Sequence, residues 1–423
     1  MNVFKFGGAS VKDADAVKNV LSILRLYEGK KLGVVISAMG KTTNAMESIV
    51  EALWKRDEES FKNLVEERRA FHMDIMNDLF KSDQDEIYQT INADFDALLS
   101  KFNDPVPDNF DFEYDQIVSL GEVLSTKIVT AYVQQEGVAA KWMDARKLIR
   151  TDRDYRQAEV DWEKTTTNFQ ERFIPEFEEN NVLITQGFVG HTSEGFTTTL
   201  GREGSDFSAG IIAYCCNAED VTIWKDVPGM LNADPKWFDN TVKLDQISFK
   251  EAIELAYYGA SVIHPKTIKP LQNKEIPLYV KSFIQPEEAG TVIQSSTEAE
   301  HLVPSFIFKL NQILFSFTPK DFSFLVEKNL SHIFDLLAQA NAKINIMQNS
   351  ALDFSVLLDA DKVSIDRILE LFSNDYQVKF NEGLELVTIR HYDQATIDRV
   401  TVDKEILLQQ KTRETARLVV KQK

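Results

Sequence analysis

The amino-acid sequence predicts an α/β protein of two or three domains, with a parallel sheet in its N-terminal part. The chain has 423 residues, which exceeds the size of one ordinary domain. Its N-terminal part alternates short apolar runs, glycine-containing turns and stretches of helical period, the pattern of a parallel α/β sheet. The composition changes near Ser295–Glu298, after which a separate module is expected.

The first expected element is an apolar strand at Val3–Phe6, followed by a Gly7-Gly8 turn and a helix that begins near Asp13. A second strand follows at 32–37, and a charged helical excursion occupies about 45–115. The remaining elements of this part are expected as strands at 139–144, 182–189, 221–225 and 277–283, as helices at 117–133 and 249–258, and as a loop followed by a helix over 201–214. This order is typical of one large α/β domain at 1–295.

The C-terminal module is expected to begin with a strand at 306–317. Further strands are expected at 343–347 and 354–358, and helices at 330–339 and 363–372. A second, similar unit begins at Leu386, where only 405–409 and 416–420 resemble strands, with little room for helices. We therefore expect modules at 300–385 and 386–423, the second one reduced.

The charge and composition exclude several classes of function. A net charge of −19 repels nucleic acid, so an anion site must be built locally from lysine, arginine and backbone N–H groups. No apolar stretch is long enough to span a membrane, and the N-terminus lacks the pattern of a secretion signal. The only cysteines, Cys215 and Cys216, are adjacent and indicate buried thiols in a reducing compartment. We expect a cytoplasmic protein that binds neither membrane nor nucleic acid.

The segment Lys5–Ser10, with sequence KFGGAS, is the first candidate site. Gly7 and Gly8 allow a tight turn with free N–H groups, and the N-terminus of the following helix attracts phosphate. Two glycines alone favour an ordinary turn. A lysine at the carboxyl end of the strand and Ser10 after the turn favour a phosphate site.

The second strand ends in polar residues that do not form a known nucleotide motif. Gly40-Lys41-Thr42 lacks the earlier glycine of a P-loop, because Val35 occupies that position. Ser37 and Thr43 remain candidate hydrogen-bond donors at a strand end, and ordinary turn and cap roles are equally compatible with this segment.

The segment Gly201–Asp206, with sequence GREGSD, precedes a helix. Arg202 offers a guanidinium fork suited to a carboxylate. Asp206 at a helix start is usually a cap, but beside an anion site it is expected to face a cation such as Lys5 or a magnesium ion.

Two further carboxylates and a lysine complete the set of candidates. Lys225 and Asp226 end a strand before a Pro-Gly loop, a common place for nucleotide contacts and equally compatible with a surface hairpin. Glu122 opens a helix, where it pairs with an ammonium group or is a solvated first-turn carboxylate.

Taken together, these segments closely resemble the aspartokinases of the amino-acid kinase family over residues 1 to about 295. The resemblance rests on KFGGAS, SAMGKTTN, SLGEVLST, DARKLIRTD, ITQGFVG, TTTLGREGSDFSA, IWKDVPGMLNADP and YYGASVIHPKTI, which occur in this order. It implies the three-layer α/β sandwich of the amino-acid kinase (carbamate-kinase-like) fold. It also implies phosphorylation of L-aspartate by ATP to 4-phospho-L-aspartate, the first step toward lysine, threonine and methionine.

The resemblance also implies a role for each candidate residue. Lys5 and Asp206 are expected to be catalytic, with Asp206 organising Lys5. The residues implied in aspartate binding are Ser37, Thr43, Glu122, Arg202, Gly204 and Ser205. Those implied around ATP are Lys5, Gly7, Gly8, Ser10, Lys225, Asp226, Leu231, Lys236 and Ser261. Mg²⁺ is expected with ATP, and no protein side chain is assigned to it as a ligand.

The chemistry suits these residue types. A side-chain carboxylate has a pKa of about 4, so the nucleophile is ionised at neutral pH and needs no general base. Catalysis then consists of positioning and charge neutralisation. Two alternatives are another enzyme of the same fold, such as a glutamate kinase, and a catalytically silent amino-acid-binding regulator. The contexts of Glu122 and Arg202 argue against the first, and intact Lys5 and Asp206 argue against the second.

The family pattern is not complete in this chain. Aspartokinases often have a lysine where Ser261 stands, a tyrosine at Leu231 and a threonine at Lys225.

Residues 306–423 resemble paired α+β, ferredoxin-like ACT regulatory domains, which implies a homodimer or larger assembly. Relatives inhibited by lysine carry acidic residues where Asn345 and Ala351 stand here, which argues against lysine and leaves the amino-acid effector open.

Overall fold

A computed structural model describes residues 1–423 apart from 83–85, 106–107, 239, 261–262 and 296–302. The chain divides into two compact units. The first comprises 1–230, 243–257 and 261–300, and the second comprises 231–242, 258–260 and 301–423. The boundary predicted at 295–300 adjoins residues outside the described part and stays a prediction.

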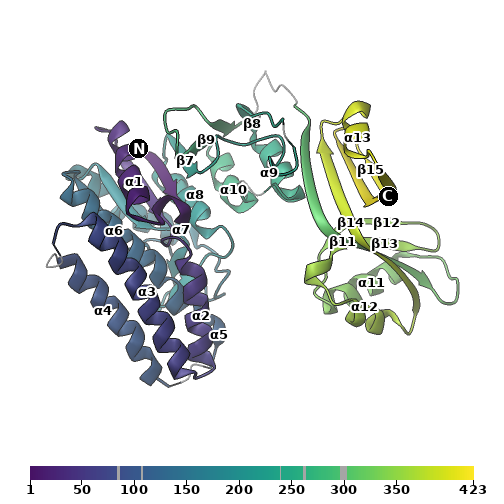
Figure 1. The fold of residues 1–423 in the computed structure, drawn as a ribbon, viewed down its shortest axis with the longest axis horizontal. Helices are drawn as coiled ribbons and strands as arrows, with labels where there is room; N and C mark the ends of the chain where they lie inside the picture. The colour runs from purple at the N-terminus through teal and green to yellow at the C-terminus, as the bar shows by residue number, and fades with distance from the viewer. Residues whose placement is uncertain (83–85, 106–107, 239, 261–262, 296–302) are drawn as a thin grey trace. The chain divides into compact units, whose positions relative to one another are not determined.

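The first unit is built on one eight-stranded sheet (Figure 1). Its order is β3-β4-β2-β1-β7-β9-β10-β8, and all neighbouring strands are parallel except β9 and β10. The strands are β1 Asn2–Phe6, β2 Leu32–Ile36, β3 Ala140–Met143, β4 Val182–Gln186, β7 Asp220–Lys225, β8 Gln246–Ser248, β9 Leu278–Ser282 and β10 Thr291–Gln294. A separate hairpin joins β5 Val189–His191 to β6 Thr197–Thr199.

Helices cover both faces of this sheet. They are α1 Ala14–Leu26, α2 Thr42–Trp54, α3 Glu58–Leu79, α4 Glu86–Ser100, α5 Phe110–Val118, α6 Leu120–Gln135, α7 Trp162–Arg172, α8 Gly204–Cys216, α9 Phe249–Tyr258 and α10 Pro265–Asn273. Helix α1 begins as the sequence predicts, because the Asp13 carboxylate accepts a hydrogen bond from Ala16 N at 2.8 Å. Short 3-10 turns occur at Gly8–Val11, Lys101–Asn103, Ala145–Lys147 and Ile174–Glu178.

The three layers follow from the alternation of side chains along β1. Phe4 and Phe6 join one continuous apolar core with residues of α1 to α6. Lys5 points to the opposite face, where it meets Asp206 of α8. The predicted three-layer sandwich is therefore confirmed, and the helical excursion forms part of its first helical layer.

Parallel pairing brings the carboxyl ends of four strands to one edge of the sheet. Phe6 pairs with Ile36 and with Trp224, and Ile36 pairs with Gln186. The residues that follow these positions therefore lie near one another. This edge carries the site described below.

The second unit contains a six-stranded antiparallel sheet in the order β12-β13-β11-β14-β16-β15. Its strands are β11 Ser305–Pro319, β12 Ile344–Asn349, β13 Phe354–Asp359, β14 Tyr376–Arg390, β15 Lys404–Lys411 and β16 Thr415–Gln422. Its helices are α11 Glu327–Gln339, α12 Ile365–Phe372 and α13 Gln394–Val400, with a 3-10 turn at Ala360–Lys362.

Two details of this unit differ from the sequence-based expectation. Leu386, where the reduced second module is predicted to begin, lies inside β14, a 15-residue strand that includes residues on both sides of 385–386; the division into two modules stays a prediction. The segment after β14 does contain a helix, α13, whose start is capped by the Asp393 carboxylate on Thr396 N at 2.8 Å. Both halves nevertheless combine strands and helices in the α+β manner expected of an ACT-like region.

Two segments from within residues 231–260 belong to the second unit. The ring of Phe238 stacks on Phe306 at 4.6 Å between centroids, and the Arg399 guanidinium lies 4.4 Å from the Phe238 ring. The Arg417 guanidinium lies 5.2 Å from the ring of Tyr258. The second unit is therefore assembled from three separate stretches of the chain.

None of the helices in the described part of the chain is long and apolar enough to cross a membrane.

We predict that Phe372→Ala destabilises the protein by about 3–5 kcal/mol, because it leaves a cavity in a closed core. Phe372 is fully buried, and its ring stacks on Phe317 at 4.1 Å. Urea unfolding measures the change. Phe322→Ala is the control, since that side chain is 72% exposed and its loss is expected to cost within about 0.5 kcal/mol. Equal effects of both variants would contradict this assignment of the core.

Candidate active site

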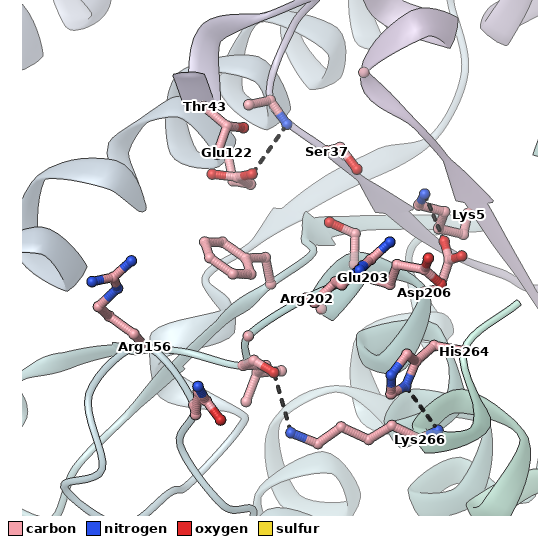
Figure 2. Close-up of a pocket in the computed structure, with 18 of the residues that line it drawn as sticks. Lys5, Ser37, Thr43, Glu122, Arg156, Arg202, Glu203, Asp206, His264 and Lys266 are labelled. Carbon is pink, nitrogen blue, oxygen red and sulfur yellow. Dashed lines mark hydrogen bonds and ion pairs between the residues drawn. The ribbon is translucent and has the colours of Figure 1, made fainter. Parts of the chain in front are cut away.

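One cavity of about 1190 Å³ lies at the carboxyl edge of the first unit's sheet (Figure 2). It brings together most residues that the sequence singles out. Those that line it are Lys5, Gly8, Ser37, Thr43, Glu122, Arg202, Gly204, Ser205, Asp206 and Lys225. Segments as far apart in the sequence as Lys5 and Lys225 thus form a single site.

A buried ion pair lies at the centre of this cavity. Lys5 Nζ lies 2.6 Å from Asp206 Oδ1, and Lys225 Nζ lies 3.8 Å from Asp206 Oδ2. The Asp206 side chain is only 4% exposed. Lys5 and Lys225 share one face of the sheet. Lys5 pairs with Ile223 of the adjacent parallel strand, and Lys225 lies two positions beyond Ile223, so both side chains point to the same side. One carboxylate therefore orients two ammonium groups at the edge of the sheet.

The first turn of α8 presents free backbone N–H groups next to this pair. Its N-cap residue, Glu203, makes no side-chain cap and has a left-handed backbone with φ 54°. Glycine permits the close approach of this turn: a Cβ on Gly187 would lie 2.5 Å from the Cβ of Ser205, and one on Gly204 would lie 2.6 Å from Phe188 Cδ2. An uncapped helix N-terminus flanked by lysines is suited to binding an anion.

The two glycine-containing turns after β1 and β2 pack against each other. Gly40 N donates to Gly8 O at 3.0 Å. A Cβ on Gly8 would lie 2.8 Å from both Ala38 O and Gly40 O, so this position accepts only glycine without a backbone shift. The turn after Lys5 and the turn after Ser37 therefore form one continuous wall.

Glu122 lies in the first turn of α6 with its carboxylate buried. Oε1 accepts a hydrogen bond from Ala38 N at 3.4 Å, and Oε2 has no hydrogen-bond partner among the described residues. Burial raises the pKa of the Glu122 carboxyl to about 8. A buried carboxylate with an open oxygen is stabilised by a cation, and the cavity is the direction from which a cation can reach it (Figure 2).

Several cavity residues have no clear signal in the sequence. Arg156 adopts a left-handed backbone with φ 69° and follows no recognisable motif. Lys266 Nζ donates to Leu200 O at 3.2 Å and lies 5.0 Å from the Phe207 ring centroid, and burial lowers the pKa of Lys266. His264 Nδ1 accepts from Lys266 N at 3.1 Å and so starts α10. The HPK part of the YYGASVIHPKTI segment is the one local signal for His264 and Lys266.

Other predicted nucleotide residues lie outside the cavity lining. Gly7 and Ser10 flank it, since a Cβ on Gly7 would lie 3.4 Å from Lys5 Nζ and Ser10 is buried behind the turn. Asp226 is exposed just beyond β7. Leu231 and Lys236 belong to the second unit, and Ser261 lies outside the described residues. Their nucleotide roles stay predictions.

No group of three or more His, Cys, Asp or Glu side chains in the described residues is arranged to hold a metal ion. The Asp206 oxygens are already within 2.6 Å and 3.8 Å of lysine ammonium groups. The lysine and arginine side chains of this cavity therefore suit phosphate and carboxylate anions.

Residues 1–282 match the model of the amino acid kinase family, which covers more than half of the chain. The chain belongs to this family. Lysine-sensitive aspartokinase 3 of Escherichia coli (strain K12) is 30% identical over 92% of this chain and 86% of that protein. This places the chain among the aspartokinases of the family.

Solved structures agree with this assignment. The structure of E. coli aspartokinase III in complex with aspartate and ADP has 27% sequence identity and a TM-score of 0.82, covering 99% of this chain and 96% of that one. The same enzyme in complex with lysine and aspartate has 27% identity and a TM-score of 0.83, covering 99% and 95%. The likeness spans both units.

We predict that Lys5→Ala lowers kinase turnover by at least about 100-fold, because it removes a positioned charge beside the reacting groups. The loss of stability should be small, because Lys225 still faces Asp206. Steady-state kinetics and thermal melting measure the two effects. Lys141→Ala on β3 of the same sheet is the control, since Lys141 pairs with Glu176 and does not line the cavity. An unchanged rate would remove Lys5 from the mechanism.

We predict that Glu122→Gln makes the ligand-free protein more stable than the native protein, increasingly so from pH 5 to pH 8. The folded-state pKa of about 8 exceeds the ordinary value of 4.5, so only the unfolded state releases this proton between the two values. The native protein therefore loses stability as pH rises, by at most about 1.4 kcal/mol per pH unit, whereas glutamine does not titrate.

Urea unfolding of the ligand-free proteins at pH 5, 6.5 and 8 measures this difference. Glu28→Gln, at an exposed glutamate of the first unit, should leave the pH dependence of stability as it is in the native protein. A Glu122→Gln curve parallel to the native curve would show that Glu122 is ionised in the empty cavity.

Proposed function

We propose that this chain transfers the γ-phosphoryl group of ATP to the side-chain carboxylate of L-aspartate, which gives 4-phospho-L-aspartate and ADP. The observation that carries the proposal is the open carboxylate oxygen of Glu122 in the same cavity as Arg202 and the Lys5–Asp206 pair. An α-amino acid with an anionic side chain offers one ammonium and two carboxylates. Its ammonium would pair with Glu122, its α-carboxylate with Arg202, and its side chain would face Lys5.

The reaction needs little from the protein beyond position and charge. The attacking carboxylate is ionised at neutral pH, so no residue has to remove a proton. Lys5 and the N–H groups at the start of α8 would offset the negative charge of the transferring phosphoryl group. Asp206 would hold Lys5 in place through the 2.6 Å contact. A fixed cation in a partly enclosed cavity costs no reorganisation during transfer.

The nucleotide would lie toward Lys225 and the glycine-containing turn at Gly8. Both line the cavity next to Lys5, and the E. coli structure that this chain resembles is a complex with aspartate and ADP. Mg²⁺ would arrive with the ATP phosphates, since Mg²⁺ commonly keeps several waters and few protein ligands. Mg·ATP is thus the second substrate of the proposed reaction.

The assembly and regulation are proposed from the second unit. We infer that its ACT-like sheet supports a homodimer or larger assembly, and that the product enters the route to lysine, threonine and methionine. An amino-acid effector is supported by the E. coli complex with lysine and aspartate. Asn345 and Ala351 lack the carboxylates of lysine-inhibited relatives, so another amino acid is the better candidate.

The test is formation of acyl hydroxamate from hydroxylamine in the presence of Mg·ATP and aspartate, glutamate or no amino acid. We expect product with aspartate, and at least about 100-fold less with glutamate, because an extra methylene displaces the reacting carboxylate from Lys5. Folded protein without an aspartate signal would refute the proposal. A larger signal with glutamate would favour a glutamate kinase, and nucleotide-independent amino-acid binding without product would favour a silent regulator.

A further inference from the structure

Asp115 is a fully buried carboxylate that the proposed chemistry does not use. It lies on α5, and it takes part in none of the ion pairs found among the described residues. Its partners are hydroxyl and backbone donors: Thr199 Oγ1 donates to Oδ1 at 2.7 Å, Thr199 N to Oδ2 at 2.8 Å, and Arg156 N to Oδ2 at 3.0 Å. Burial raises the pKa of Asp115 to about 6, so the group is ionised at neutral pH and these hydrogen bonds are charge-assisted.

The two segments that meet at this carboxylate each carry an arginine of the cavity wall. Arg156 donates its own backbone N–H to Asp115. Thr199 ends β6 and leads through Leu200 and Gly201 to Arg202. The segments also contact each other, because Ala158 N donates to Thr199 O at 3.0 Å and a Cβ on Gly201 would lie 3.3 Å from Arg156 O. A shift at Asp115 would therefore move both arginines.

Helix α5 connects these arginines to the wall that carries Glu122. Helix α6 follows α5 directly, and Glu122 lies in its first turn. The Arg156 side chain is also held by α5, since Nη1 lies 3.1 Å from Asp111 Oδ1 and the guanidinium lies 4.3 Å from the Tyr114 ring. The spacing between Glu122 and the two arginines is thus set through a single helix.

We propose that Asp115 is a positioning residue for the amino-acid substrate: it holds the segments at Arg156 and Thr199–Arg202 at the distance from Glu122 that a C4 dicarboxylic amino acid spans. The inference rests on the proposed function and adds the residue that sets its substrate spacing. Asp115 does not line the cavity, so it acts through the arginines and not by contact with substrate. Nucleotide binding, at Lys225 and Gly8, does not depend on it.

The variant Asp115→Asn tests this role. An asparagine replaces one acceptor oxygen by an NH₂ group, which then faces a backbone N–H of Arg156 or Thr199 and forces the segments apart. We expect KM for aspartate to rise by about 10- to 100-fold, because a misplacement of about 1 Å has effects of that size. The KM for ATP and kcat should stay within about threefold of the native values, a split that a general loss of stability does not produce.

The matched control is Glu113→Gln on the same helix. Glu113 is also a buried carboxylate, with its Oε1 2.7 Å from Lys101 Nζ, but it does not line the cavity. This variant should lower the melting temperature and leave KM for aspartate unchanged. If Asp115→Asn does not fold, Thr199→Val serves instead, because it removes one hydroxyl donor and keeps the side-chain shape. It should raise KM for aspartate by about threefold or more, in keeping with one hydrogen bond to a charged group.

The outcomes separate this inference from the function on which it rests. Native protein without hydroxamate from aspartate refutes the function itself. Active native protein with an unchanged KM for aspartate in folded Asp115→Asn, or in Thr199→Val where the former does not fold, overturns the positioning role. An equal rise of KM for aspartate and for ATP overturns it as well, since Asp115 would then support the cavity as a whole.

Discussion

The ion pair between Lys5 and Asp206 is the interaction on which the arrangement of the site depends. An ammonium and a carboxylate buried at 2.6 Å tolerate little displacement, because separating two poorly hydrated charges weakens a strong attraction. The pair joins the end of β1 to the first turn of α8, and this contact requires α8 to approach the sheet edge closely. Gly187 and Gly204 supply the space, and Glu203 accepts a left-handed backbone at the helix start. A chain with a net charge of −19 thus gathers cations at one edge, where anions must bind.

The sequence predicts the elements and the main groups of the site because both follow local rules. Apolar runs and glycine-containing turns define β1, β2, β4 and β7, and parallel pairing brings Lys5, Ser37 and Lys225 to a common edge. The sequence does not predict the contacts of Asp115, because this residue lies in a charged helical stretch and its partner Thr199 is 84 residues away. Long-range hydrogen bonds of this kind leave no periodic signal. The predicted nucleotide residues Leu231 and Lys236 belong to the second unit, most of which comes from later in the chain.

Asn345 in the second unit is another residue whose contacts the sequence does not predict. The amide of Asn345 is fully engaged inside the unit, because Lys309 Nζ donates to its Oδ1 at 2.9 Å while its Nδ2 donates to Gln312 Oε1 and Asp359 Oδ1 at 2.8 Å. The sequence shows that a carboxylate is missing at this position, and the structure adds that an ammonium of the chain itself is already bound there. Likewise, the order of strand-like and helix-like segments divides 300–385 from 386–423, whereas β14 passes through that division as one strand.

The second unit is made of three separate stretches of the chain, and this limits where the chain can be divided into fragments or joined to a part of a related protein. The aromatic stack on Phe306 is completed by Phe238, a residue that precedes it by dozens of positions and is flanked on both sides by chain of the first unit. A fragment that starts after residue 302 would lack that ring and expose an apolar surface. A transfer of the second unit between relatives would therefore have to include residues 231–242 and 258–260, and a single crossover point would not transfer this unit intact.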